Sequence, residues 1–245
     1  MKKIPQITLA FWVMKICATT LGETAGDLFS MTMHLGYALS ALLLMGLFVI
    51  ALVAQLRSQH YHPLLYWMLI LLTSTVGTNM SDYLDRTAGL GYAKGSLVLC
   101  ILLLAIFIFW RFSMPSLSVK RIVTLKGEGL YWAAILVSNT LGTALGDFLA
   151  DESHLGFAGG ALLIAGLLGL VILATFCTSI SKTFLFWAAF ILTRPFGATM
   201  GDLLTKTHAN GGLGFGTIGS SFVLASLLVL FILFTNRPPK AISHL

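Results

Sequence analysis

The stretch WAAILVSNTLGTALGD (residues 132–147) is the third of four copies of one pattern in this chain. Each copy starts with a tryptophan, has a glycine ten residues later and has an aspartate fifteen residues later, without a gap. The members are Trp12, Trp67, Trp132 and Trp187; Gly22, Gly77, Gly142 and Gly197; and Asp27, Asp82, Asp147 and Asp202. A fixed internal repeat of this length indicates that one structural unit is used four times.

A second signature, Leu-Gly followed by Tyr or Phe, comes after each aspartate. It lies at residues 35–37, 90–92, 155–157 and 213–215. The tryptophans are 55, 65 and 55 residues apart, so copy one matches copy three and copy two matches copy four. Doubling of an already doubled unit explains this spacing.

The composition indicates a protein that lies in lipid. A mean hydropathy of +0.91 and a charged fraction of 10% exclude a water-soluble domain of 245 residues, because its surface would need far more charge. Apolar stretches of about 20 residues, enough to cross the hydrocarbon of a bilayer, lie near residues 8–28, 36–56, 64–84, 91–112, 129–149, 156–177, 184–204 and 214–235. The sequence therefore predicts an all-α polytopic membrane protein with eight transmembrane helices, two in each copy.

The positive charges predict the topology. Ten of the fifteen Lys and Arg residues lie at the two ends of the chain or in the connections after spans two, four and six. By the positive-inside rule, both termini are expected in the cytoplasm. This distribution also explains the net charge of +6 without a nucleic-acid partner. Because every copy has two spans, all copies run in the same sense, which favours a pseudo-rotation axis along the membrane normal.

The four tandem copies, each marked by its tryptophan, resemble a family of bacterial membrane proteins. That family is defined by four copies of a two-helix repeat of unknown function. The resemblance implies no activity. We expect one integral membrane domain in the bacterial cytoplasmic (inner) membrane, with copies at residues 1–60, 61–120, 121–181 and 182–245.

The four aspartates are the main candidates for a functional site. Fifteen helical residues cover roughly 22 Å, so tryptophans near the cytoplasmic interface would put all four acids at one depth towards the outer side. An aspartate in hydrocarbon costs about 2.5–3.5 kcal/mol, which favours a polar cavity. Asp27, Asp82, Asp147 and Asp202 would supply oxygen ligands for a cation. Glu23 adds a carboxylate one helical turn before Asp27.

Other polar residues are candidate accessory groups, namely His34, His154, Arg194, Asn79 and Asn139. Carboxylates alone suit Mg, Ca or Mn, whereas imidazole shifts the preference towards transition metals. Solvated histidines are the more ordinary alternative. Arg194 lies deep in span seven and needs a partner: it could neutralise one acid of the ring, serve as an internal counter-charge that competes with the cation, or bind an anionic substrate. Lys15 is expected to extend to the nearby cytoplasmic interface.

Purely structural roles are the alternative for every one of these motifs. Gly-x-x-x-Gly pairs let membrane helices approach closely, the tryptophans are interfacial anchors or packing residues, and the aspartates could end the helices or cap the connections that follow.

The function predicted from the residues is a transporter or channel for a divalent metal ion, Mn-like in its ligand preference. The first alternative is a transporter of a small organic solute whose acidic group contacts Arg194, and the second is a structural membrane protein without a substrate. No hydrolase elbow, zinc-protease pair or phosphate loop occurs in the sequence, so we expect neither an enzyme nor a cofactor. A homo-oligomer is left open.

Overall fold

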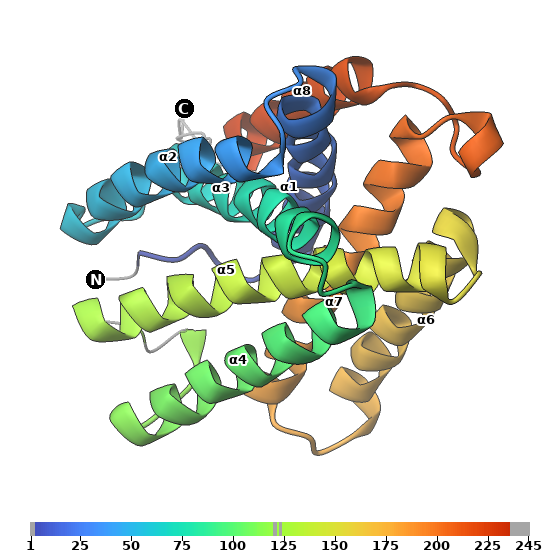
Figure 1. The fold of residues 1–245 in the computed structure, drawn as a ribbon. Helices are drawn as coiled ribbons and strands as arrows, with labels where there is room; N and C mark the ends of the chain where they lie inside the picture. The colour runs from blue at the N-terminus through green and yellow to red at the C-terminus, as the bar shows by residue number, and fades with distance from the viewer. Residues whose placement is uncertain (1–2, 120–121, 123, 236–245) are drawn as a thin grey trace, which may run out of the picture.

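The computed structural model describes residues 3–119, 122 and 124–235, and this part of the chain folds into eight α-helices. Their bounds are α1 Leu9–Asp27, α2 Tyr37–Arg57, α3 Pro63–Asp82, α4 Tyr92–Ser113, α5 Leu125–Asp147, α6 Gly156–Cys177, α7 Lys182–Thr205 and α8 Thr217–Thr235. The all-α fold with two helices in each of four tandem copies is confirmed (Figure 1).

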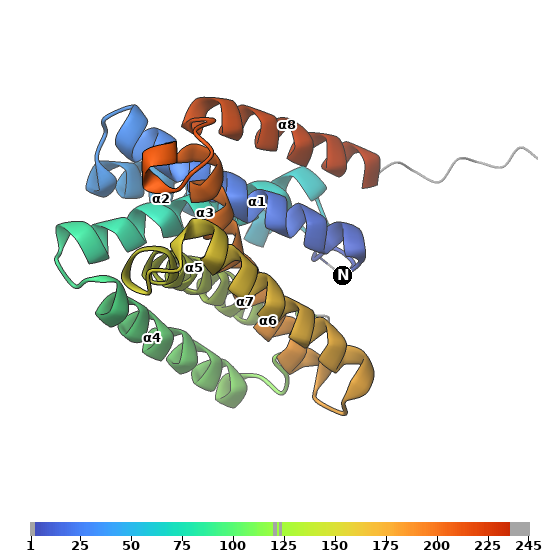
Figure 2. The same ribbon diagram turned by 90° about the vertical axis from the view of Figure 1, so that its right-hand side faces the viewer.

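The first helices of the four copies form an inner ring. Helix α1 packs against α3 and α7, and α5 packs against the same two neighbours, so the ring closes. The second helices form an outer layer, and each packs on the first helix of the following copy: α2 on α3, α4 on α5, α6 on α7 and α8 on α1 (Figures 1 and 2). Every copy therefore depends on the next one for its main helix contacts.

The repeat glycines explain why the inner helices pack this closely. A Cβ on Gly22 would overlap Ser74, one on Gly77 would lie 2.9 Å from the Asn139 backbone, and the equivalent glycines of α5 and α7 meet Arg194 and Thr19. Each repeat glycine thus faces the residue seven positions after the tryptophan of the next copy. Removing the side chain is what permits such an approach.

The glycine contacts also fix the direction of the copies. Gly22 faces Ser74, and Gly26, four residues further along α1, faces Thr78, which is four residues further along α3. Contacts that advance together along both helices mean that the two helices run in parallel. The same register holds between α5 and α7 and between α7 and α1, which confirms parallel copies around a rotation axis.

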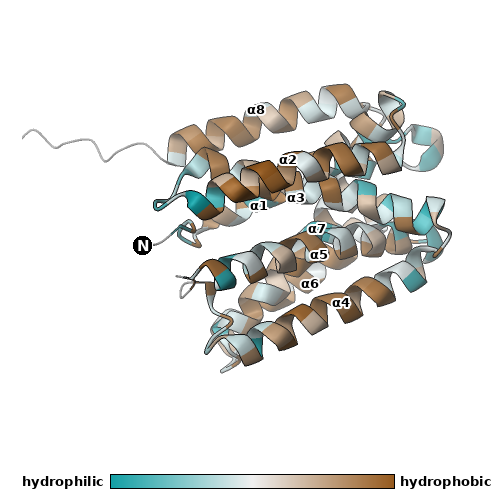
Figure 3. Cartoon of the chain, turned by 60° about the vertical axis from the view of Figure 1, so that its left-hand side comes forward, coloured by the Kyte–Doolittle hydropathy of each residue, from teal (hydrophilic) through white to brown (hydrophobic). Residues whose placement is uncertain are grey.

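The outer helices carry the apolar surface. In the apolar stretch of α2, 22% of the residues are buried, against 67% in that of α3, and α2, α4 and α8 are strongly hydrophobic in Figure 3. Six of the described helices, α2, α3, α4, α5, α6 and α8, are long and apolar enough to cross a membrane. Helices α1 and α7 carry buried charges but hold ring positions equivalent to α3 and α5. The protein is a multi-pass membrane protein.

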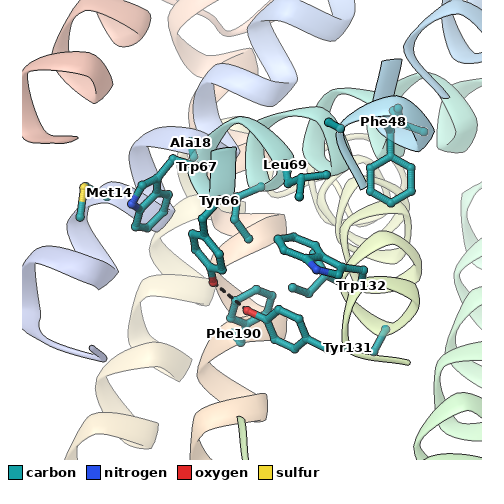
Figure 4. Close-up of a cluster of buried hydrophobic side chains, with 14 of the residues drawn as sticks. Met14, Ala18, Phe48, Tyr66, Trp67, Leu69, Tyr131, Trp132 and Phe190 are labelled. Atoms are coloured by element: carbon teal, nitrogen blue, oxygen red, sulfur yellow. Dashed lines mark hydrogen bonds between the residues drawn. The ribbon is translucent and has the colours of Figure 1, made fainter. Parts of the chain in front are cut away.

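An aromatic belt closes the end of the ring at which the inner helices begin. The residue before each tryptophan is also aromatic and contacts the tryptophan of the next copy, at ring-centroid distances of 5.6, 5.6, 6.1 and 5.8 Å; the pairs are Phe11 with Trp67, Tyr66 with Trp132, Tyr131 with Trp187 and Phe186 with Trp12. The hydroxyl groups of Tyr66 and Tyr131 are hydrogen bonded at 2.7 Å (Figure 4). Of the two roles expected for the tryptophans, packing is therefore the one observed, with only Trp12 half-buried.

The opposite end of the ring carries the turns that follow the aspartates. Helices α1, α3 and α5 end at the repeat aspartate and continue as one π-helical turn each, at Leu28–Thr32, Tyr83–Thr87 and Phe148–Glu152. Helix α7 instead ends at Thr205, and its connection contains a short 3₁₀ turn at His208–Asn210. Copy four thus differs from the others where its three inserted residues lie.

Candidate functional site

Asp82 and Asp147 are held together by one arginine. Arg86 Nε lies 3.0 Å from Asp82 Oδ1, and Arg86 Nη2 lies 3.3 Å from Asp147 Oδ2. Arg86 Nη1 also donates to the Tyr37 hydroxyl at 3.2 Å. Both carboxylates are buried, whereas a third of the Arg86 side chain is exposed. The guanidinium therefore covers this acid pair from the end of the bundle.

Asp27 and Asp202 are held together by one lysine in the same way. Lys206 Nζ lies 2.5 Å from Asp27 Oδ2 and 3.1 Å from Asp202 Oδ1. Burial lowers the pKa of Lys206, but the two carboxylates outweigh this effect and raise the pKa above its ordinary value. The lysine thus remains a charged ammonium group between the two acids.

Arg86 and Lys206 are equivalent residues, and they were missed as site residues by sequence reasoning. Each lies four residues after the aspartate of its copy, in copies two and four, where copies one and three have Met31 and Asp151. An acid and a base four residues apart on a helix face each other, so this spacing was the available signal. The two bridges divide the four aspartates into two pairs, one from copies two and three and one from copies four and one. This agrees with the sequence, in which copy two matches copy four and copy three matches copy one.

None of the three aspartates that precede a π-helical turn caps that turn. Asp27, Asp82 and Asp147 stand at its N-terminal position, and their side chains accept no capping hydrogen bond there. The carboxylates contact Arg86 and Lys206 instead. The capping alternative is therefore not what the side chains do in this structure.

One of the two pairs has a third carboxylate. Glu23, Asp27 and Asp202 are all buried and each offers an oxygen atom, and these atoms lie within 4.8 Å of one another. We call these three residues the acidic trio. Three carboxylate oxygens at this spacing suit a hard divalent cation such as Mg²⁺, Ca²⁺ or Mn²⁺. The other pair lacks this third acid, because copy three has Thr143 where copy one has Glu23.

Arg194 lies one level deeper, on the axis of the ring, and contacts every inner helix. Its Nη2 lies 2.9 Å from Glu23 Oε2 and donates to the hydroxyls of Thr78 at 2.7 Å and Thr143 at 2.6 Å. The side chain is completely buried. Glu23 is thus the acidic partner that was expected for a buried Arg194. Arg194 Nε and Nη1 are buried and have no hydrogen-bond partner among the described residues.

Lys15 is also buried on the axis, and the prediction that it extends to the membrane interface is wrong. Its exposed fraction is 0%. The ammonium lies 3.4 Å from Asn139 Oδ1 and 4.1 Å from the centroid of the Phe190 ring. Its ammonium lies inside the ring against α5 and α7 and is not exposed, so the side chain does not reach the surface. The described part of the chain shows no acidic partner for it.

The candidate accessory residues fall into two groups. His34 and His154 are exposed and adopt positive φ angles of 57° and 59° at the ends of π-helical turns, apart from the acidic trio. Asn79 and Asn139 are buried in the ring. Asn139 links Lys15 to Thr73, to which it donates at 2.9 Å, whereas Asn79 donates to its own helix at Thr75. The site around the aspartates is therefore built from carboxylates with arginine and lysine side chains, and neither histidine takes part.

The comparison with protein families finds the same four copies that form the ring. The model of the Repeat of Unknown Function (DUF347) matches four times, at residues 10–61, 65–115, 130–181 and 185–238. The chain belongs to this family. The resemblance noted from the four tryptophans is thereby confirmed. No curated protein and no solved structure is detectably similar to this chain, so the family supplies an architecture and no activity.

Proposed function

We propose that this protein is a transporter or channel that carries a divalent metal ion such as Mn²⁺ across the membrane. The observation that carries the proposal is the acidic trio, in which three buried carboxylates come within 4.8 Å of one another. Glu23, Asp27 and Asp202 are the proposed ion ligands. Asp82 and Asp147 complete the ring and add to the negative potential that attracts cations.

The charge distribution supports an orientation. Of the residues at the ends of the helices, Arg57, Arg111, Lys126 and Lys182 lie at the end of the bundle where the inner helices begin. We place this end and both termini in the cytoplasm of a bacterial cell, by the positive-inside rule. The acidic trio would then face the periplasmic side of the cytoplasmic membrane, and the aromatic belt would close the ring on the cytoplasmic side.

Flux through the purified protein tests the proposal. The protein would be reconstituted in liposomes containing a Mn²⁺-quenched dye, and the rate of quenching measured after external Mn²⁺ is added. We expect flux in the unmodified protein and loss of it in the double variant Asp27→Asn/Asp202→Asn, because amides lack the charge that compensates a dehydrated divalent ion. Asp151→Asn, which changes an exposed acid of the same end, is the matched control. Equal flux in dye-filled liposomes without protein, or unchanged flux in the double variant, would refute the proposed function.

A second candidate function is transport of a small organic anion. The specific observation in its favour is that Arg194 Nε and Nη1 are buried without a hydrogen-bond partner among the described residues, and a planar guanidinium binds carboxylates with two nitrogens. Arg194→Lys separates the two functions. It would abolish uptake of a carboxylate-bearing solute, since the two-nitrogen geometry is lost, and leave a Mn²⁺ flux largely intact.

A further inference from the structure

The ammonium group of Lys206 occupies the acidic trio in the way that a small cation would. It contacts Asp27 and Asp202, which are two of the three proposed ligands, through one nitrogen atom. We propose that Lys206 is a built-in competitor, so that a divalent cation binds the acidic trio only by displacing the Lys206 ammonium into solvent. This inference rests on the proposed function and adds a condition for it.

The charges of the site favour exchange for a divalent ion. Arg194 remains paired with Glu23 and compensates one of the three carboxylates. With Lys206 in place, the trio has one uncompensated negative charge, and when Lys206 leaves, it has two. A divalent cation then neutralises the buried site, whereas a monovalent cation replaces the ammonium without gain in charge. Neutrality matters here because uncompensated buried charge is expensive.

The position of Lys206 in the chain allows it to leave. Lys206 is the first residue after α7 and has an extended backbone, with φ −67° and ψ 153°. Its backbone stays held by hydrogen bonds from Lys206 N to Asp202 O and from Gly214 N to Lys206 O, so only the side chain has to move. About a quarter of the Lys206 side chain is already exposed. A turn about the side-chain bonds is enough to bring the ammonium into water.

Arg86 is the internal comparison, because it holds the equivalent acid pair more firmly. It contacts Asp82 and Asp147 through two different nitrogens and Tyr37 through a third. It also lies inside the π-helical turn Tyr83–Thr87, and its pair lacks a third carboxylate. Exchange is therefore proposed for the Lys206 pair and not for the Arg86 pair.

Mn²⁺ binding to the detergent-purified full chain, followed by the loss of the free Mn²⁺ resonance signal, tests the competition. Lys206→Gln is expected to bind Mn²⁺ about tenfold more tightly than the unmodified protein, which corresponds to about 1.4 kcal/mol. Lys206→Arg retains the competing charge and is expected to bind no more tightly than the unmodified protein. Lys94→Gln, at an exposed lysine of the same end, is the control and should not tighten binding.

A second measurement uses the unmodified protein, so that it does not depend on the folding of a variant. A water-soluble amine-reactive reagent is applied with and without Mn²⁺, and labelling of Lys206 is read by mass spectrometry against Lys94. Mn²⁺ is expected to increase labelling of Lys206 several-fold and leave Lys94 unchanged.

The outcomes separate this inference from the proposed function. Mn²⁺ flux with unchanged Lys206 labelling, or Lys206→Gln binding no tighter than the unmodified protein, overturns the competitor role while transport stands. Absence of Mn²⁺ binding and flux in the unmodified protein and in Lys206→Gln overturns both. Tighter binding in Lys206→Gln together with Mn²⁺-dependent labelling supports the inference.

Discussion

Arg194 is the residue through which the four inner helices are joined on the axis. Glu23 of α1, Thr78 of α3 and Thr143 of α5 all contact a single nitrogen of its guanidinium group. The hydroxyls and the carboxylate accept from this one nitrogen of a side chain that is wholly removed from solvent, whereas Nε and Nη1 have no hydrogen-bond partner among the described residues. An arginine so enclosed stabilises the ring only while its acid partner is present.

Replacing Arg194 by methionine leaves Glu23 as an unpaired acid in the interior. We expect the change to lower stability by about 3–5 kcal/mol, the usual cost of breaking a buried ion pair from one side. Thermal unfolding of the detergent-purified protein measures it. The double variant Arg194→Met/Glu23→Gln should recover most of the loss, since no charge is then left unpaired. A double variant as unstable as the single one would contradict the assigned pairing.

Replacing Lys15 by methionine is expected to have the opposite effect. Its ammonium is buried with an amide oxygen at 3.4 Å and an aromatic ring as described partners, which compensates poorly for the loss of water. We expect Lys15→Met to raise stability by about 1–4 kcal/mol, by analogy with apolar replacement of buried ions. The same unfolding measurement detects it. A destabilised Lys15→Met variant would mean that the Lys15 ammonium contributes more to stability than its contacts with Asn139 and Phe190 explain.

At the site, the sequence pointed to the acids and to Arg194, but not to Arg86 and Lys206, the two bases that bridge the aspartates. Searching for what all copies share finds Asp27 and its three equivalents, because each copy must use the same position in the ring. Arg86 and Lys206 occur in only two copies, so a search for common residues passes over them. Their role depends on bridging to another copy, to Asp147 and Asp27, and sequence spacing along one helix does not reveal a partner on another.

Among the elements, the interfaces between inner helices depend on single glycines. Gly77 lies where a Cβ would be 2.9 Å from the backbone of Asn139 and Thr140 on α5. Backbone cannot move aside without shifting the whole helix, so even a methyl group is too large there. Gly46 of α2, in contrast, has open space around its Cα.

This contrast predicts opposite signs for one substitution. Gly77→Ala should destabilise the protein by about 1–3 kcal/mol through overpacking, whereas Gly46→Ala should stabilise it slightly, by up to about 1 kcal/mol, through helix propensity. Both are measured by thermal unfolding in the same detergent. If both changes were neutral, the inner helices would not pack as closely as described.

The helices were predictable and their partners were not. Hydropathy and the repeat gave eight helices in parallel copies because apolar length and an even number of spans determine them. The packing of α2 on α3, the first helix of the next copy, could not be predicted from the same data. Hydropathy measures how apolar a face is, and the outer helices are apolar all round, so nothing in their sequences selects one neighbour.

At the scale of the whole molecule, the exchange of outer helices between copies makes the two halves interdependent. Helix α4 of the first half packs on α5 of the second, and α8 of the second half packs on α1 of the first. The inner contacts of α3 with α5 and of α1 with α7 also join the halves. Each half alone would expose both of these surfaces.

Splitting the chain between α4 and α5 tests this arrangement. Co-expressed fragments of residues 1–118 and 119–245 should assemble, so that an affinity tag on one fragment recovers the other from detergent extracts. Each fragment expressed alone should be degraded or aggregate. Fragments that purify separately as folded proteins would show that the halves do not need the interfaces described.

The closed ring also limits what a chain with a single copy could form. A chain with a single copy could form the same contacts only as an assembly of four identical subunits, and every residue on the axis would then be present four times. An arginine at the level of Arg194 would bring four guanidinium groups together, which mutual repulsion forbids. Fusion of the copies into one gene product lifts this restriction, and threonine, serine, asparagine and arginine now share that level, at Thr19, Ser74, Asn139 and Arg194. The asymmetric centre, on which the proposed chemistry depends, is thus closed to an assembly of four identical copies and open to the fused chain.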